Sequence, residues 1–246
     1  MAKSAAKGRK QKGRTRGHMR PLWLRAFRAL GLVLAVVIAL PLVLVPVYAL
    51  VPPPASTLML VQMGQGVKLT RDWVPMDEMG TRLPTSVLMS EDGRFCAHGG
   101  VDWDAVQTVI EEASDGGGLR GASTITMQVV KNLFLWPSRS FVRKGLEVPL
   151  ALYADLIWSK RRTMELYLNI AEWGPGIFGA GAAADHYFGR SPADLTARQA
   201  AQMTSALPNP FVRNARNPGP RTRRLASIIE TRAAKAGPYD DCLYPG

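Results

Sequence analysis

Two adjacent carboxylates, Glu91 and Asp92, are the residues in this sequence whose types and spacing first suggest chemistry. An aromatic ring at Phe95, an imidazole at His98 and three glycines follow them. Polar groups buried without partners in a plain core cost about 1–3 kcal/mol each, so such a cluster is more typical of a site. The alternative is that both acids occupy the first turn of a helix, near the positive end of its dipole. The residues alone leave both interpretations open.

Two further polar stretches carry groups that suit one kind of reaction. The first holds hydroxyl, amide and ammonium side chains, at Ser123, Thr124, Gln128, Lys131 and Asn132. The second holds two cations and an acid, at Arg143, Lys144 and Glu147. Moving a sugar between oxygens needs a carboxylate that takes a proton from the incoming hydroxyl. A phosphate leaving group would be stabilised by cations. The residue types therefore point to glycosyl chemistry.

The pair formed by Arg143 and Glu147 also has a purely structural interpretation. The two residues are four positions apart and so share one face of a helix. On an exposed helix such a pair contributes only about 0.3–0.5 kcal/mol and serves no site.

The elements that must position these residues are predicted to be helices. Apolar spacing predicts a helix over 101–113. Ser123 or Thr124 can cap the next helix, which runs to Trp136 and stops at Pro137. The fold is therefore expected to be mainly α, with little extended sheet.

For some other segments the sequence allows more than one secondary structure. A helical pattern covers 143–171, and within it Pro149 must either kink the helix or start a new one. The segment 57–63 fits a strand or the start of a helix. Short Ala-rich or basic helices are predicted at 182–188, 196–207 and 221–235.

The strongly basic charge belongs to the N-terminus. The formal net charge is +12, but ten of the 31 Lys and Arg residues lie before position 52, where no Asp or Glu occurs. The remaining cations nearly balance the 19 acids, so the basicity does not indicate a nucleic-acid-binding domain. A nucleic-acid-binding arm at 1–20 is the alternative for the tail alone.

Behind this basic tail, residues 1–28, the stretch 29–51 is uncharged and almost wholly apolar. As a helix it is long enough to cross a hydrocarbon core of about 30 Å, and it is too long for the apolar region of a cleavable signal peptide. The positive-inside rule then places the N-terminus in the cytoplasm. We expect a single-pass anchor at 29–51 and an exported domain at 52–246.

The cysteines and histidines indicate neither a disulfide framework nor a metal site. Cys96 and Cys242 are the only two cysteines and are far apart, so we expect two unpaired thiols, with a bridge as the alternative in an oxidising compartment. The histidines, His18, His98 and His186, are isolated and show no metal-ligand spacing.

Four motifs occur in order along the chain. Glu-Asp-x-x-Phe-x-x-His-x-Gly begins at Glu91, and Gly-x-Ser-Thr-Ile-Thr-x-Gln-x-x-Lys-Asn begins at Gly121. Arg-Lys-x-x-Glu begins at Arg143, and a fourth motif comprises Lys160, Glu165, Tyr167, Leu168 and Asn169. The ordered set resembles the bacterial peptidoglycan glycosyltransferases, and most closely the monofunctional biosynthetic peptidoglycan transglycosylases. The resemblance covers roughly residues 80–212. Met127 stands where that family usually has a glutamine, and Thr163 and Met164 replace its usual Ile-Leu.

The resemblance implies a lysozyme-like, mainly helical domain that polymerises lipid II into β-1,4 glycan strands and releases undecaprenyl pyrophosphate. It implies that Glu91 is the general base and Glu147 the second catalytic carboxylate, near the donor's pyrophosphate. Asp92 would orient Glu91 or the local backbone, while Phe95 and His98 would be structural. The remaining site residues would bind substrate, the cations contacting pyrophosphate and the others sugar or phosphate groups: Ser123, Thr124, Gln128, Lys131, Asn132, Arg143 and Lys144.

The resemblance also implies partners and a location. The partners are lipid II, the nascent glycan chain, the membrane and other cell-wall synthesis proteins, with no nucleic acid. No cofactor is obligatory, and Mg²⁺ or Mn²⁺ near Glu147 is an optional metal. The enzyme would sit in the bacterial cytoplasmic (inner) membrane with a periplasmic catalytic domain.

Two rival functions remain. A lytic transglycosylase or lysozyme would cut glycan with a similar fold, and a non-catalytic membrane-anchored protein would only recruit wall-synthesis partners. A second, transpeptidase activity would need Ser-x-x-Lys, and the only such tetrad, Ser4 to Lys7, lies in the basic tail. We therefore expect a monofunctional enzyme.

Overall fold

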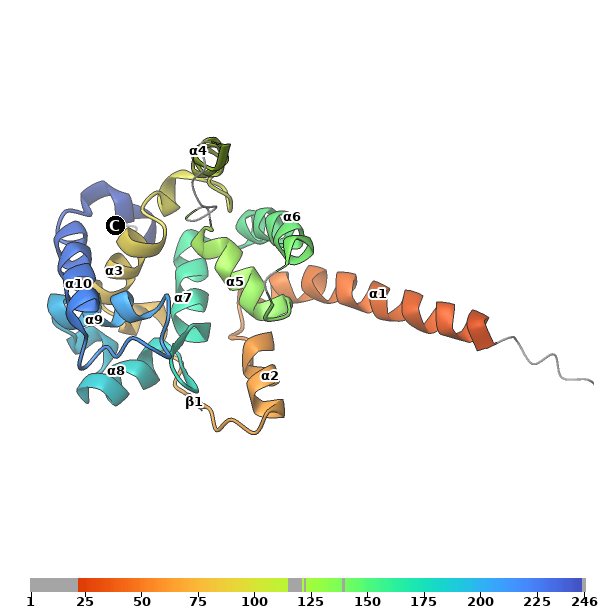
Figure 1. Ribbon diagram of the computed structural model, residues 1–246, viewed down its shortest axis with the longest axis horizontal. Coiled ribbons are helices and arrows are strands. Elements are labelled where there is room, and N and C mark those ends of the chain that lie inside the picture. The colour runs from red at the N-terminus through yellow and green to blue at the C-terminus, as the bar shows by residue number, and fades with distance from the viewer. Residues whose placement is uncertain (1–21, 115–120, 122, 139, 245–246) are drawn as a thin grey trace, which may run out of the picture. The chain divides into compact units, whose positions relative to one another are not determined.

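The computed structural model describes residues 22–114, 121, 123–138 and 140–244, and the expected mainly helical fold is confirmed (Figure 1). The chain divides into two units, Met1–Leu40 and Pro41–Gly246. Besides short 3-10 turns and a small sheet, the described helices are α1 (Leu22–Tyr48), α2 (Thr57–Gly64), α3 (Arg82–Glu91), α4 (Trp103–Ser114), α5 (Ile125–Phe134), α6 (Phe141–Ile157), α7 (Lys160–Ile170), α8 (Ala180–Phe188), α9 (Ala197–Ala206) and α10 (Pro220–Ala233).

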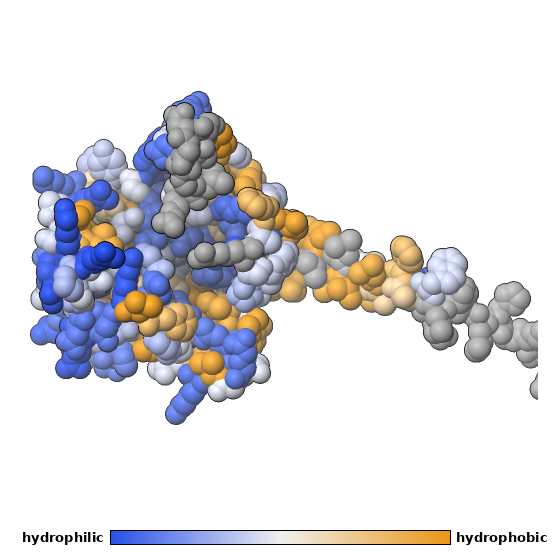
Figure 2. All heavy atoms as spheres, in the orientation of Figure 1, coloured by the Kyte–Doolittle hydropathy of each residue, from blue (hydrophilic) through white to orange (hydrophobic). Residues whose placement is uncertain are grey.

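Helix α1 contains the apolar stretch expected to be a membrane anchor. Its segment Ala26–Tyr48 is long and apolar enough to cross a bilayer, and apolar side chains cover its described part (Figure 2). The helix ends three residues before the predicted boundary at Val51 and continues through Pro41 and Pro46. Most of the basic tail, residues 1–21, lies outside the described residues.

The helices that carry the second, third and fourth motifs begin at hydroxyl caps. The Thr124 side chain accepts a hydrogen bond from the Met127 amide at the start of α5, at 3.1 Å. Ser140 does the same for α6 and Ser159 for α7. A capping hydroxyl satisfies an amide that the helix leaves unpaired, so these residues fix where each helix begins. Helix α5 packs against both α6 and α7, which brings the second, third and fourth motifs together.

Two ambiguous segments are resolved as helix. Residues 57–63 lie in α2, where Ser56 caps the first turn and Met59 is buried. Pro149 lies inside α6, which runs continuously from Phe141 to Ile157, so neither a new helix nor a break occurs there. Ala151 and Ala154 of this helix are fully buried, and this packing stabilises a helix that a proline would otherwise weaken.

The sheet is small, and its order is β1-β3-β2. Strand β1 (Thr70–Arg71) pairs parallel with β3 (Ile177–Phe178), and β2 (Glu172–Gly174) pairs antiparallel with it. Gly179 follows β3 with φ +84°, and a Cβ there would lie 2.8 Å from the Asp72 carbonyl oxygen. The glycine therefore permits a close backbone approach.

Helices α9 and α10 pack on each other and both pack on α3, which ends at Glu91. The start of α9 is fixed by a capping box between Thr196 and Gln199. Helix α3 is thus supported by this helical pair, and its last residue, Glu91, accepts a hydrogen bond from Gln128 of α5.

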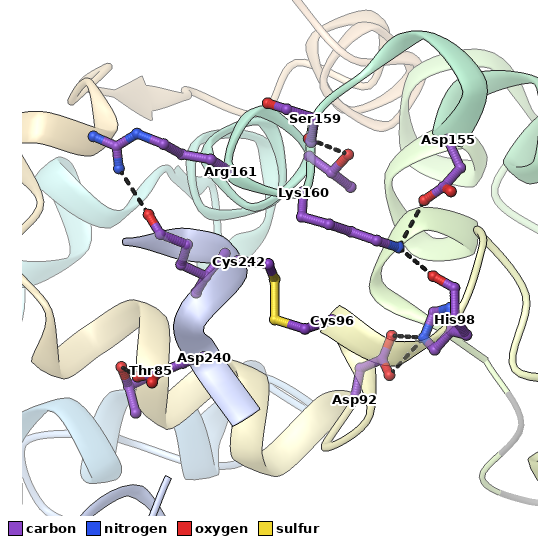
Figure 3. The surroundings of a disulfide bond; sticks show 12 residues. Thr85, Asp92, Cys96, His98, Asp155, Ser159, Lys160, Arg161, Asp240 and Cys242 are labelled. Atoms are coloured by element: carbon purple, nitrogen blue, oxygen red, sulfur yellow. Dashed lines mark hydrogen bonds and ion pairs between the residues drawn. A yellow bond between two sulfur atoms is a disulfide. The ribbon is translucent and has the colours of Figure 1, made fainter. Parts of the chain in front are cut away.

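The expectation of two unpaired thiols is wrong. Cys96 and Cys242 form a disulfide, with their Cα atoms 5.6 Å apart, inside the range that a disulfide requires (Figure 3). Cys242 lies in a C-terminal 3-10 segment, η4 (Gly237–Leu243), which returns to the turn η2 (Phe95–Ala97). The sequence separation of 146 residues hides this proximity.

Candidate active site

Glu91 is the last residue of α3, and its side chain is partly buried. Burial raises the pKa of the Glu91 carboxyl, because the charged form is poorly solvated there. Long hydrogen bonds from Gln128 Nε2 (3.4 Å) and Ser90 Oγ (3.5 Å) oppose the shift, as does the positive charge of Arg213. A carboxylate with a raised pKa is the group expected of a proton acceptor.

Asp92, the residue after Glu91, organises the surrounding backbone. Its two oxygens lie 3.0 and 3.1 Å from Nε2 of His98, and Oδ2 also accepts from the Ile125 amide at 2.9 Å. Asp92 therefore ties the end of α3 to the first residue of α5. Of the two roles expected for Asp92, the geometry favours orientation of the local backbone.

Phe95 and His98, expected to be structural, lie in this framework. Phe95 is fully buried, and the ammonium of Lys160 lies 4.8 Å from the centre of its ring. The same ammonium donates to the His98 carbonyl (2.6 Å) and to Asp155 (2.7 Å). The turn between Asp92 and His98 is thus fixed by a helix from the fourth motif (Figure 3).

Gln128, on α5, connects Glu91 to a buried tyrosine. The Tyr167 hydroxyl donates to Gln128 Oε1 at 3.3 Å, while the Gln128 amide donates to Glu91. Burial raises the pKa of Tyr167 well above its usual value, and the charge of Glu91 adds to the shift. The hydroxyl therefore stays protonated, and its donation fixes which end of the Gln128 amide faces the carboxylate.

A cation cluster surrounds the second carboxylate. Glu147 is only 3% exposed, its Oε1 lies 2.8 Å from Arg143 Nη1, and its Oε2 lies 3.0 Å from Lys144 Nζ. Lys144 also donates to the Ser123 hydroxyl at 2.6 Å. The interpretation of Arg143 and Glu147 as an exposed pair is therefore wrong, because α6 turns this face inward against α5.

Lys131 links the two halves of the site. Burial lowers the pKa of its ammonium, while the negative charges of Glu147 and Glu91 both raise it. Its side chain therefore lies within electrostatic range of both carboxylates, in the same cluster as Arg143 and Lys144. The structure brings Glu91, the cations and Glu147 into one site.

Two cavities meet at Arg143. One, of about 620 Å³, has mainly apolar walls from α4, α5 and α6, with Ser123, Arg143 and Lys144 as polar lining residues. The other, of about 360 Å³, is lined by Lys131, Asn132 and Arg143 together with Trp136. Met127, in the position where a glutamine was expected, lines the larger cavity with its thioether side chain. An apolar hollow beside cations suits a ligand that joins a hydrocarbon to an anion.

The remaining predicted site residues have different settings. Thr124 is buried, caps α5 and donates to the Gly100 carbonyl at 2.6 Å, so its hydroxyl is occupied by backbone. Asn132 lines the smaller cavity with a partly exposed side chain.

Glu147 is the residue beside which the optional metal was expected. Among the described residues, no group of three or more His, Cys, Asp and Glu side chains could hold an ion. Both Glu147 oxygens already face cations, whereas Mg²⁺ and Mn²⁺ prefer free oxygen ligands.

Sequence reasoning missed contributions from three residues. Tyr167 and Lys160 belong to the fourth motif but had no role assigned, because nothing in their spacing reveals the partners they meet on α5 and at His98. Arg213, whose charge acts on Glu91, lies on the loop after α9 and donates to the Ser205 carbonyl. No local pattern marks it.

Comparison with known proteins assigns the family. Residues 59–233 match the transglycosylase family model. The chain is 54% identical over 213 residues to a biosynthetic peptidoglycan transglycosylase of Agrobacterium fabrum, covering 85% of this chain and 93% of that protein. It is 52% identical over 226 residues to the protein of that name from Rhizobium meliloti, covering 92% and 96%. A Brucella suis relative of the same name is 54% identical, covering 86% and 95%. With these relatives matched over nearly their whole length and the motifs assembled in one site, the chain belongs to the transglycosylase family.

Proposed function

We propose that this protein is a peptidoglycan glycosyltransferase that polymerises lipid II into β-1,4 glycan strands. Its relatives are named biosynthetic peptidoglycan transglycosylases. The observation that carries the proposal is that α5 serves both carboxylates: its Gln128 donates to Glu91, and its Lys131 lines one cavity with Arg143, the partner of Glu147. A proton acceptor and a cluster that can hold a pyrophosphate therefore share one site.

Glu91 acts as the general base in this proposal. It takes the proton from the 4-hydroxyl of the acceptor sugar, whose oxygen then bonds to C1 of the growing chain. The raised pKa of Glu91 supports this role, because a carboxyl with a pKa closer to the working pH is a better proton acceptor. Gln128 and Ser90 orient the carboxylate through their hydrogen bonds.

The leaving group is undecaprenyl pyrophosphate, which departs with inversion at C1. Lys131, Arg143 and Lys144 neutralise its charge, and Glu147 holds two of these cations in position. Ser123, bonded to Lys144, and Asn132, in the smaller cavity, are placed to contact phosphate or sugar groups. The larger, mainly apolar cavity lies beside the same cations and suits the start of the polyprenyl chain.

The proposed location is the cytoplasmic membrane, with the larger unit outside the cytoplasm. The apolar helix supports an anchor, and the disulfide supports an oxidising compartment such as the periplasm. Exposed Leu60 and Met63 of α2, and Phe141 and Val142 of α6, offer apolar contacts for the membrane in which lipid II lies. Anchoring enzyme and substrate in the same membrane raises their effective concentration.

The test is polymerisation of labelled lipid II by the detergent-solubilised full chain, with muramidase digestion of the product. We expect muramidase-sensitive polymer from the wild type and from Glu230→Gln, a control that makes the same chemical change on α10. We expect none from Glu91→Gln. Cleavage of preformed glycan without polymerisation would instead indicate a lytic enzyme, and neither activity would indicate a non-catalytic anchor protein.

A further inference from the structure

The C-terminal segment 237–244 lies beyond the residues that match the transglycosylase family model, yet it contacts the turn between Asp92 and His98. The covalent contact is the disulfide from Cys242 to Cys96, and Cys96 lies in the middle of that turn. Figure 3 shows the sulfur bridge beside the pair formed by Asp92 and His98.

Non-covalent contacts fasten the same segment to α3. Thr85 donates to the Asp240 carboxylate at 2.5 Å, and the Tyr244 hydroxyl donates to the Thr81 carbonyl at 3.1 Å. Burial raises the pKa of Tyr244 to about 12, so this hydroxyl remains a donor. Because α3 ends at Glu91, the segment is fixed to the helix that carries the candidate base.

A third contact reaches α7. Arg161 Nη1 donates to the Leu243 carbonyl at 3.1 Å, and the neighbouring Lys160 donates to the His98 carbonyl. The turn is therefore held from one side by Lys160 and from the other by Cys242 (Figure 3).

We propose that segment 237–244 is a positioning element of the candidate active site, and that the Cys96–Cys242 disulfide is the bond through which it acts. The bridge fixes the turn that presents His98 to Asp92, and Asp92 in turn binds the Ile125 amide at the start of α5, the helix whose Gln128 donates to Glu91. Without the bridge, the turn keeps Lys160 but loses its covalent support. The effect on catalysis rests on the proposed function, whereas the effect on the pair formed by His98 and Asp92 does not.

The experiment compares the oxidised and reduced forms of the full-length protein. A dithiol such as dithiothreitol reduces the bridge, its two thiols supplying two electrons and two protons and closing into a ring disulfide. The variant Cys96→Ala/Cys242→Ala is the permanently open form. Thr196→Ala, which removes the cap of α9 away from the turn, is the control for a general loss of stability.

Two readouts are taken well below the unfolding temperature. On reduction, we expect kcat for lipid II polymerisation to fall about tenfold, because a small displacement of a reacting group lowers the rate by about this factor or more. We expect KM to change less than about twofold. We expect the ¹⁵N signal of His98 Nε2 to move in histidine-labelled protein. Re-oxidation should restore both, the double variant should not respond to dithiol, and Thr196→Ala should keep the wild-type kcat and His98 signal.

Each other outcome overturns the positioning role. An unchanged kcat in the reduced protein refutes the positioning role directly. A fall in kcat of the same size in Thr196→Ala also refutes it, because stability alone would then explain the loss. An unmoved His98 signal refutes the positioning role even if kcat falls. If the oxidised wild type does not polymerise lipid II, the proposed function fails, and the His98 signal alone decides the positioning role.

Discussion

Replacing Glu147 by glutamine tests whether the buried carboxylate holds the cation cluster together. The substitution keeps the size of the side chain but removes a negative charge that is 3% exposed and faces two cations. Removing one partner of a buried ion pair typically costs about 3–5 kcal/mol, because the other charge stays buried without compensation. The Arg143 side chain is only 13% exposed, so its charge would stay buried without a partner. The Lys144 side chain is 42% exposed and can turn its charge into water.

We therefore expect the low end of that range, a loss of about 3 kcal/mol in the free energy of unfolding. For a unit of this size the loss corresponds to a fall in Tm of about 6–12 °C. Thermal unfolding of the detergent-solubilised chain, followed by near-ultraviolet circular dichroism, measures it. The variant Glu230→Gln, which changes only a half-exposed pair with Arg198, is the control and should stay within about 1 kcal/mol of the wild type.

The same substitution changes the electrostatics of Lys131. The charge of Glu147 is the largest influence that opposes the burial-induced lowering of the Lys131 pKa. Its removal should lower that pKa further, which ¹³C-lysine NMR can follow through a pH titration. A wild-type Tm together with an unshifted Lys131 titration would refute the reasoning, since neither could hold if Glu147 neutralises this cluster.

Three further predictions concern the environment of Glu91. Glu91→Gln should raise Tm at pH 7. A carboxyl whose pKa is raised in the folded state contributes most stability below its unfolded pKa, and this contribution is lost as the pH rises through the folded pKa. At pH 7 the wild type therefore bears the cost of a buried charge that glutamine lacks, and a Tm below that of the wild type would contradict this. Gln128→Leu removes a hydrogen bond that lowers the Glu91 pKa, so the acid limb of the pH profile of kcat/KM should move to higher pH. A shift to lower pH would refute the assignment of Glu91 as the base. Tyr167→Phe frees the Gln128 amide to rotate and should move the same limb in the same direction by a smaller amount; an unmoved limb would mean that the hydroxyl does not orient the amide.

Local signals predicted most of the helices but not every boundary. The candidate caps Ser123 and Thr124 located the start of α5, and alanine-rich composition located α9, because these signals act within a few residues. Pro149 was ambiguous, since packing of buried alanines on the same helix decides whether it breaks. Propensity carries no information about that packing.

The candidate site was predicted from the ordered motifs, but its connections were not. The sequence shows Arg143 and Glu147 four residues apart, and only the packing of α6 on α5 makes that pair buried. Tyr167 and Arg213 act on the Glu91 site from positions 76 and 122 residues later in the numbering. Contacts over such separations depend on the whole topology, and the same reason hid the partner of Cys96.

The position of Cys242 has a consequence for biogenesis. A chain that crosses the membrane from its anchored N-terminus presents Cys96 first, and its partner emerges only 146 residues later. In the proposed topology, oxidation of the pair must wait until translocation has passed Cys242. A chain stalled before that point would contain Glu91 and the cations of the candidate site, yet would lack the bridge to the turn between Asp92 and His98. Closure of the bridge would thus report that export has passed Cys242.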